Sequence, residues 1–332
     1  MSRPRARSLA AVAGLVLAVA GCSSRKDERA KEEVFSSAAA ARAKRPFDFG
    51  HPVEALRTGA DEAAAREGSF AWEARVSWTV ARPGTPPLRA EERHLLRQLA
   101  TGEFEVSADV DPGAGPGSET GKQIVYARGM TYARGRWAPF RERPTDRGRD
   151  ARRYRDESFR LAGDLADLYG PALAASPAGE STWLGRRARR FRLSLSGAAP
   201  REAPPPPELP DGGYDADTRR RVDFLEGRVP AALEGELLLD ADTGVPLSVT
   251  MRGAFSERAD PQLRAQVELA AEVKAIGGDV AAVLPPKGAL ADERKPKGVA
   301  RALEAAGLRK HAGVEEREGA EDEGEGEPPP GE

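Results

Sequence analysis

The sequence predicts an α+β domain in which one amphipathic helix interrupts a long antiparallel β-sheet. Several stretches alternate apolar and polar residues with a period of two, and segments rich in Gly and Pro separate them. That pattern is typical of neighbouring antiparallel strands joined by turns. At 154–169 the apolar residues instead recur every three or four positions, and Gly170-Pro171 follows, which predicts a helix and its end.

Strands are expected on both sides of that helix. A first helix, with a modest apolar stripe, is predicted at 52–67 and is ended by Gly68. The strands are predicted at 72–80, 88–100, 104–110, 123–127, 130–134, 190–196, 233–239, 247–251 and 263–273. Asp240 and Gly244 lie between two of them, where a hairpin turn needs a positive φ and side chains that close the turn. The segment 198–217 contains four consecutive prolines and is expected to be an extended loop.

The composition is that of a folded domain with solvated extensions. Of the 332 residues, 39% are hydrophobic and 31% are charged, which fits one domain of ordinary size or two small ones. The formal net charge of −2 provides no overall field that would attract nucleic acid, so no nucleic-acid partner is expected.

The first 22 residues are typical of an exported lipoprotein. Three arginines precede an apolar run, Leu9 to Gly21, that is too short to span a hydrocarbon core of roughly 30 Å. Val19-Ala20-Gly21-Cys22 resembles the bacterial lipobox, which implies cleavage before Cys22 and attachment of lipid to its thiol and new amino group. An ordinary signal peptide with an incidental cysteine is the alternative. Cys22 is the single cysteine of the chain, so its lipidation leaves none for a disulfide.

These features divide the chain into four parts. Residues 1–21 are the expected signal peptide, and 22–50 a charged, flexible tether to the membrane. Residues 51–284 are the expected folded domain, and 285–332 a tail rich in Pro and acidic residues that is expected to be disordered. Ser23 follows the cysteine, which in enterobacterial lipoproteins favours release to the outer membrane, facing the periplasm.

The order of these elements resembles the LolA/LolB and LppX/LprG group of envelope lipoproteins and lipid carriers. The stretch 234–252 is similar to a hairpin of that group, in which a D-x-x-T-G-x-P turn, here Asp240 to Pro246, joins two long strands. The segment MTYARGRWAP from Met130 resembles its short central strands. Over roughly residues 53–284 the resemblance implies a strongly curved, open half-barrel whose concave face is covered by helices over an apolar cavity.

Large apolar residues of the predicted strands are expected to share one face of the sheet. As a plain core they would pack against the helix at 154–169, and as a cavity wall they would contact acyl chains. The two alternatives remain open and can coexist. The candidate ligand-binding residues are Trp72, Trp78, Phe104, Leu193, Leu239, Leu247, Val249 and Val267.

No pattern in the sequence predicts catalysis, a metal site or a cofactor. His51, His94 and His311 are scattered, whereas a zinc site needs about four ligands, or three and a water. A G-x-S-x-G nucleophile motif is absent, and the carboxylate pairs fall in turns or on polar faces. The arginine clusters at 186–192 and 219–221 could bind anionic headgroups, but a solvated strand face paired with acids is favoured.

The sequence therefore predicts a membrane-anchored, non-enzymatic lipoprotein of the cell envelope. It is expected to bind or transfer a lipid or lipoprotein cargo in an apolar cavity. The alternative is a non-catalytic scaffold or assembly lipoprotein that docks an envelope protein partner.

Replacement of the anchor residue tests the lipobox. We expect Cys22→Ala to abolish incorporation of radiolabelled palmitate, because the thiol that accepts the diacylglyceryl group is removed. Persisting label in the variant would show that the lipobox assignment fails.

Overall fold

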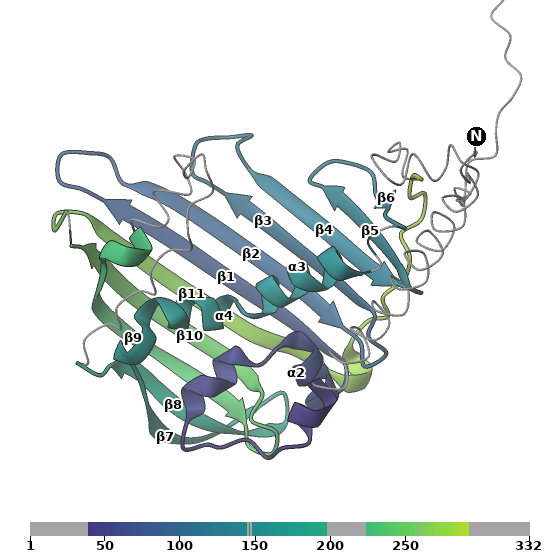
Figure 1. Ribbon diagram of the computed structural model, residues 1–332, viewed down its shortest axis with the longest axis horizontal. Helices are drawn as coiled ribbons and strands as arrows, with labels where there is room; N and C mark the ends of the chain where they lie inside the picture. Colours follow the sequence, from purple (N-terminus) through teal and green to yellow (C-terminus); the bar gives the residue numbers. More distant parts are fainter. Residues whose placement is uncertain (1–38, 145, 147, 198–223, 259, 292–332) are drawn as a thin grey trace, which may run out of the picture.

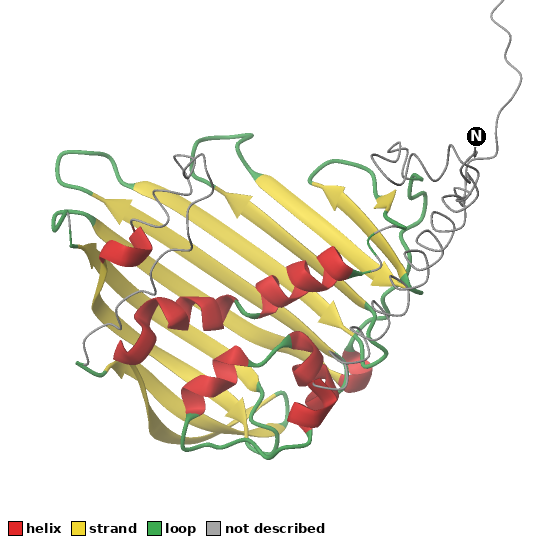
Figure 2. Cartoon of the chain, viewed as in Figure 1, coloured by secondary structure: helices red, strands yellow, loops and turns green. Residues whose placement is uncertain are grey.

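One antiparallel sheet of eleven strands forms the body of the protein and does not close on itself. The computed structural model describes residues 39–144, 146, 148–197, 224–258 and 260–291. The strand order is β6-β5-β4-β3-β2-β1-β11-β10-β9-β8-β7, so the first and last strands in sequence pair in the middle of the sheet. Helices lie across one face only (Figures 1 and 2). This is the open half-barrel α+β fold that the sequence predicts.

The strands of the sheet are joined mainly by short turns, and long-range pairing is antiparallel throughout the named strands. The strands are β1 (Phe70–Ala81), β2 (Leu88–Gln98), β3 (Phe104–Asp111), β4 (Thr120–Ala127), β5 (Met130–Gly135), β6 (Arg141–Glu142), β7 (Leu173–Trp183), β8 (Arg186–Leu195), β9 (Arg228–Asp240), β10 (Pro246–Glu257) and β11 (Arg264–Ile276). The helices are the 3₁₀ turns η1 (Pro52–Arg57), η2 (Gly170–Ala172) and η3 (Gly277–Asp279), and the α-helices α2 (Ala60–Glu67), α3 (Arg149–Phe159) and α4 (Leu161–Tyr169).

Both predicted helices are broken in the structure. The helix expected at 52–67 is a 3₁₀ turn followed by α2, because Thr58 and Gly59 adopt extended conformations between them. The helix expected at 154–169 begins earlier, at Arg149, and is divided at Arg160 into α3 and α4. The break allows the two halves to follow the curved sheet diagonally, as Figure 1 shows.

Strand β7 is an element that the sequence analysis missed. Most of its middle residues are exposed, so they carry no apolar alternation. It pairs with β8 alone and contains Pro177, where the register shifts towards Gly179. A proline and a bulge are typical of an edge strand.

The last residues of the predicted tether lie against the folded domain. Residues 39–50, at the end of the predicted tether, contact α2 and the β9–β10 turn, where Phe47 lies against Gly244. Gly244 has a φ of 72°, and a Cβ there would overlap the Phe47 ring, so only glycine fits. Several predicted features lie outside the described residues: the signal peptide, Cys22, the proline-rich loop at 198–217, Arg219 to Arg221 and the acidic tail beyond residue 291. Within the described residues, no helix combines the length and apolarity needed to cross a membrane.

The helices are held on the sheet by a buried arginine. The Arg155 side chain is 1% exposed and donates from both terminal nitrogens to Asp61 of α2, at 2.6 and 2.8 Å. It also donates to the Gln98 side chain of β2 at 3.2 Å and lies 5.0 Å from the Phe104 ring centroid. One guanidinium therefore joins α3, α2 and the sheet.

Loss of this guanidinium should destabilise the whole fold. We expect Arg155→Ala to lower the free energy of unfolding by about 3 kcal/mol, because it removes the link to Asp61, leaves the buried Gln98 side chain without this partner and opens a cavity. Urea unfolding monitored by circular dichroism measures this. Arg153→Ala, on the exposed face of the same helix, is the matched control and should change stability by less than about 0.5 kcal/mol. Equal effects of the two substitutions would contradict the proposed role of Arg155.

The predicted hairpin turn is closed by Asp240, as its sequence indicates. The Asp240 carboxylate accepts hydrogen bonds from the backbone N–H groups of Asp242 and Thr243, at 3.0 and 2.9 Å. Its other oxygen accepts from Arg186 Nε at 2.6 Å, and Arg186 also pairs with Glu67 of α2. Burial opposes ionisation of Asp240, but the Arg186 and backbone donors outweigh it and lower the pKa of Asp240 below 3.8.

This lowered pKa gives Asp240 a stability contribution with a defined pH window. The contribution is present above 3.8 and is lost as the pH falls through the folded-state pKa. We expect Asp240→Asn to lower the free energy of unfolding at neutral pH by about 1–3 kcal/mol. The variant and the natural protein should differ less in free energy of unfolding when unfolding is measured below pH 3.8. Asp242→Asn is the control, because the Asp242 side chain is 68% exposed. If the stability difference between Asp240→Asn and the natural protein did not change with pH, the proposed contribution of the Asp240 carboxylate would be contradicted.

Candidate functional site on the concave face

The two faces of the sheet differ in chemistry, because alternate residues of each strand point to opposite sides. On β1, Trp72, Ala74 and Val76 point towards the helices and are buried, whereas Arg75 is exposed on the other side. The sheet curls towards the helices: Trp183 of β7 donates to the carbonyl of Val273 in β11 at 3.0 Å, although three strands separate them in the sheet. We call the helix-bearing side the concave face and the other the outer face.

All eight candidate residues lie on the concave face. Seven belong to a single core cluster and are at most 3% exposed, and the eighth, Trp78, is half-buried against the same cluster. The structure thus brings together residues that are nearly 200 positions apart in sequence. The seven buried residues are Trp72, Phe104, Leu193, Leu239, Leu247, Val249 and Val267.

One end of the concave face is filled by the helices, and we call it the closed end. Here Phe159 of α3 packs between Phe70 and Trp72, with ring centroids at 5.3 and 5.1 Å. The space left beside Trp72, Phe159 and Val249 is about 10 Å³, which is about the room needed for one water molecule. The indole N–H of Trp72 has no hydrogen-bond partner within the described part of the chain.

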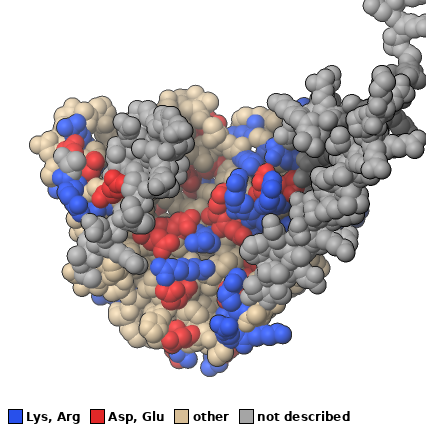
Figure 3. Space-filling view, in the orientation of Figure 1, with Lys and Arg blue, Asp and Glu red and all other residues tan. Residues whose placement is uncertain are grey.

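The opposite end of the concave face, where β1 ends and β2 begins, is less covered, and we call it the open end. Trp78 and Val80 of β1, Ala90 of β2 and Val110 of β3 point to the concave side there and are half-buried. The space-filling view shows a hollow on this side of α3 and α4 (Figure 3). We call the surface formed by these four residues the concave hollow.

Polar groups border the concave hollow on the side of α3. Lys122 of β4 lies 4.6 Å from the ring centroid of Tyr154. Burial, followed by the negative charges of Asp109, Glu157 and Glu92, raises the pKa of Tyr154 to about 12, so its hydroxyl stays protonated at neutral pH. An apolar floor with a polar border suits an amphipathic molecule better than a fully polar one.

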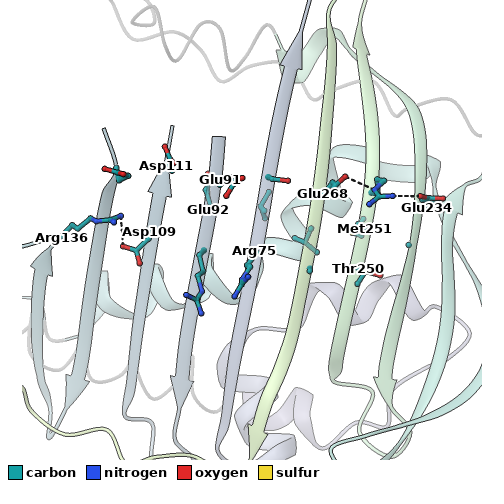
Figure 4. Close-up of a pocket in the computed structure, with 18 of the residues that line it drawn as sticks. Arg75, Glu91, Glu92, Asp109, Asp111, Arg136, Glu234, Thr250, Met251 and Glu268 are labelled. Carbon is teal, nitrogen blue, oxygen red and sulfur yellow. Dashed lines mark hydrogen bonds and ion pairs between the residues drawn. The ribbon is translucent and has the colours of Figure 1, made fainter. Parts of the chain in front are cut away.

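The outer face carries a different hollow, of about 980 Å³, which Figure 4 shows in close-up. Charged side chains line it: Arg252 of β10 lies between Glu234 at 3.7 Å and Glu268 at 3.0 Å, and Arg136 pairs with Asp109 at 3.7 Å. Glu91 and Asp111 face each other directly across β2 and β3. We call this surface the outer hollow. Burying an acyl chain there would remove these charges from water, which is costly.

Sequence analysis did not single out the outer hollow, although a signal for it was present. Its charged residues are the polar positions of the same alternating strands that predicted the core, and the register aligns them in a row across the sheet. The arginine cluster of β8 behaves as favoured from the sequence: Arg186 pairs with Glu67 and Asp240, and Arg187 with Asp242 at 3.0 Å.

The two described histidines contact different residues. His94 is buried and its ring nitrogens lie 3.0 Å from Ser158 Oγ and 3.3 Å from Glu92. His51 is exposed beside Asp48, and His311 lies outside the described residues. Among the described residues, no three His, Cys, Asp or Glu side chains gather closely enough to hold a metal ion.

Comparison with known proteins gives matches in structure only. No protein-family model matches the chain, and no curated protein sequence matches it. Among solved structures, the chain is similar to lipoprotein LppX of Mycobacterium tuberculosis at 7% identity and a TM-score of 0.22, covering 71% of this chain and 100% of LppX. A LolA superfamily protein from Nitrosomonas europaea matches at 8% identity and a TM-score of 0.18, covering 63% of this chain and 88% of that protein.

A third match is the structure of MucB, at 15% identity and a TM-score of 0.21, covering 72% of this chain. The chain spans 61% of the length of MucB. These matches include members of the group that the sequence resembles. At such TM-scores they carry no argument about function, and the half-barrel assignment rests on the strand order and the one-sided helices described above.

Proposed function

We propose that the protein is a non-enzymatic lipoprotein of the bacterial cell envelope that holds an acyl chain of a lipid or lipoprotein cargo in its concave hollow. The observation that carries the proposal is the half-covered apolar face. Trp78, Val80 and Val110 are large apolar residues on a face that is otherwise buried, yet the helices leave them half-buried. Apolar surface left uncovered beside a core marks an interaction site.

The energetics favour an acyl chain as the occupant. Each methylene group moved from water to an apolar surface contributes about 0.8 kcal/mol, so every methylene group that the concave hollow covers favours binding. The void of about 10 Å³ at the closed end is too small to admit such a chain. The cargo would therefore lie at the open end, above α3 and α4, and the seven buried candidate residues would support the hollow from below.

The amino terminus supports a position at a membrane. Lipidation at Cys22, predicted from the lipobox, would attach the domain to a bilayer through a tether of residues 22–50. We propose the outer membrane, on its periplasmic side, as the location. A tethered protein would receive or hold cargo at its own membrane.

A substitution in the concave hollow tests the proposal. In protein carrying Cys22→Ala, which has no acyl chain of its own, we expect native mass spectrometry and solvent extraction to recover bound lipid. Trp78→Ala should weaken binding of a fluorescent fatty-acyl probe by roughly tenfold or more, because it removes a large apolar contact.

Trp137→Ala is the matched control, because Trp137 is 89% exposed in the loop after β5 and is not one of the four residues of the concave hollow. Its probe affinity should equal that of the parent protein. Recovery of no lipid and no uptake of the probe would count against the proposal, as would equal affinities for the Trp78 and Trp137 variants.

The outer hollow supports a second candidate, a scaffold that docks an envelope protein. Its volume of about 980 Å³ and its exposed charges suit a polar protein surface. Crosslinking in the envelope separates the two candidates. A scaffold should yield one dominant protein adduct, and substitution of Glu91 and Asp111 should remove it without changing uptake of the acyl probe.

A further inference from the structure

Basic side chains gather beside the concave hollow, over strands β4 to β6 and the start of α3. The space-filling view shows Lys and Arg side chains concentrated there (Figure 3). The group includes Lys122 of β4, Arg143 after β6, and Arg149 and Arg153 in the first turns of α3. We call these four residues the basic border.

The register places Lys122 and Arg143 on the concave side. Lys122 pairs with Ala108, which is buried on that face, and its amine lies over the Tyr154 ring. The N–H of Arg143 donates to the carbonyl of Thr131 at 2.8 Å, which continues the β5–β6 pairing and puts Arg143 opposite Thr131. Thr131 is buried on the concave side, 2% exposed.

These two cations lack the partners that other basic residues of the protein have. Within the described residues, Lys122 and Arg143 form no ion pair, whereas Arg75 and Arg93 share Glu73, and Arg252 bridges two glutamates. Burial, and then the positive charge of Arg143, lower the pKa of Lys122, and the negative charges of Asp150 and Glu157 offset part of this effect. The fold therefore holds like charges together at half-buried positions, which costs free energy unless an anion lies between them.

The direction of α3 adds to the same field. Three of the first five residues of this helix are arginines, at the positive end of its dipole, where cations are unfavourable. They are Arg149, Arg152 and Arg153. Asp146 partly compensates, since its carboxylate accepts from the backbone N–H of Asp150 at 2.8 Å. Arg149 and Arg153 also pair with acids of the same helix, Asp150 at 3.8 Å and Glu157 at 3.6 Å, which leaves Lys122 and Arg143 as the two cations of the basic border without an ion pair among the described residues.

We propose that the basic border binds the anionic, phosphate-bearing headgroup of a lipid whose acyl chain lies in the concave hollow. This inference rests on the proposed function and names the class of its ligand. Three strand spacings separate β4 from β1, roughly 14 Å at about 4.8 Å each, and Trp78 lies four residues beyond Ala74, which is level with Lys122, roughly 13 Å at about 3.3 Å each. The resulting distance is roughly 20 Å, which an extended acyl chain can span. A headgroup on Lys122 and Arg143 would therefore leave its chain free to reach Trp78.

Photocrosslinking of the full-length protein in vesicles tests the headgroup preference. The protein is reconstituted through its own anchor into phosphatidylcholine vesicles that contain a diazirine-labelled probe, either phosphatidylglycerol or phosphatidylcholine with identical chains. We expect more adduct with the phosphatidylglycerol probe. The double substitution Lys122→Gln and Arg143→Gln should lower that adduct about tenfold, as loss of a charge-assisted hydrogen bond predicts, and leave the phosphatidylcholine adduct unchanged.

Two further variants separate binding from general effects. Arg89→Gln with Arg192→Gln makes the same change in net charge on the outer face, where neither side chain has an ion pair among the described residues, and should keep the preference. Lys122→Arg keeps the positive charge and should also keep the preference for the phosphatidylglycerol probe. It shows that a loss of preference in the double variant comes from the lost charge and not from misfolding.

The outcomes distinguish the two proposals. Equal adducts with both probes, mapped to the concave hollow, would overturn the headgroup inference and leave the acyl-binding proposal standing. Adducts with neither probe would overturn both. An equal loss in the outer-face control would show that net charge, and not the basic border, sets the preference.

Discussion

The ion pair between Arg155 and Asp61 fixes the relation between the helices and the sheet. A half-barrel exposes one apolar face, and that face is stable only when something covers it. Here the short helices α2, α3 and α4 cover it, and each alone would be marginal in water. Arg155 joins α3 to α2 and to Gln98 of the sheet, so the cover has one orientation. Because the cover stops at the closed end, the open end keeps its apolar side chains within reach of a ligand.

The two faces of the same strands serve different physical roles. On the concave face, apolar side chains exclude water, and Gly253 leaves space for the Tyr169 hydroxyl that a Cβ would overlap. On the outer face, charges stay in water and pair in rows across the sheet, as Arg252 does with its two glutamates. Such exposed pairs add little stability. They keep the outer face soluble while the concave face is left apolar, which is the division that an amphipathic ligand requires.

The sequence predicted the sheet well because one face of each central strand is buried. Alternation around Trp72 located β1, and the turn at Asp240 located the β9–β10 hairpin, since each depends on neighbours along the chain. The break between α3 and α4 at Arg160 was not predictable, because it depends on the curvature of the sheet beneath the helices. Arg155 looked like one more residue of a charged run, and Lys122 meets Arg143 only through folding. Pairings of this kind depend on contacts between distant segments, which a pattern of neighbouring residues does not contain.

The two edges of the sheet have a consequence for the proposed attachment of the protein to a membrane. Anchoring confines molecules to a plane and raises their effective concentration, so exposed strand edges would tend to join one copy to the next. On β7, Pro177 removes a donor and the adjacent shift in register bends the strand. On β6, the short edge is covered by Leu290, whose carbonyl accepts from Glu142 at 2.9 Å. If the proposed anchor holds copies side by side on a bilayer, these features oppose their joining edge to edge.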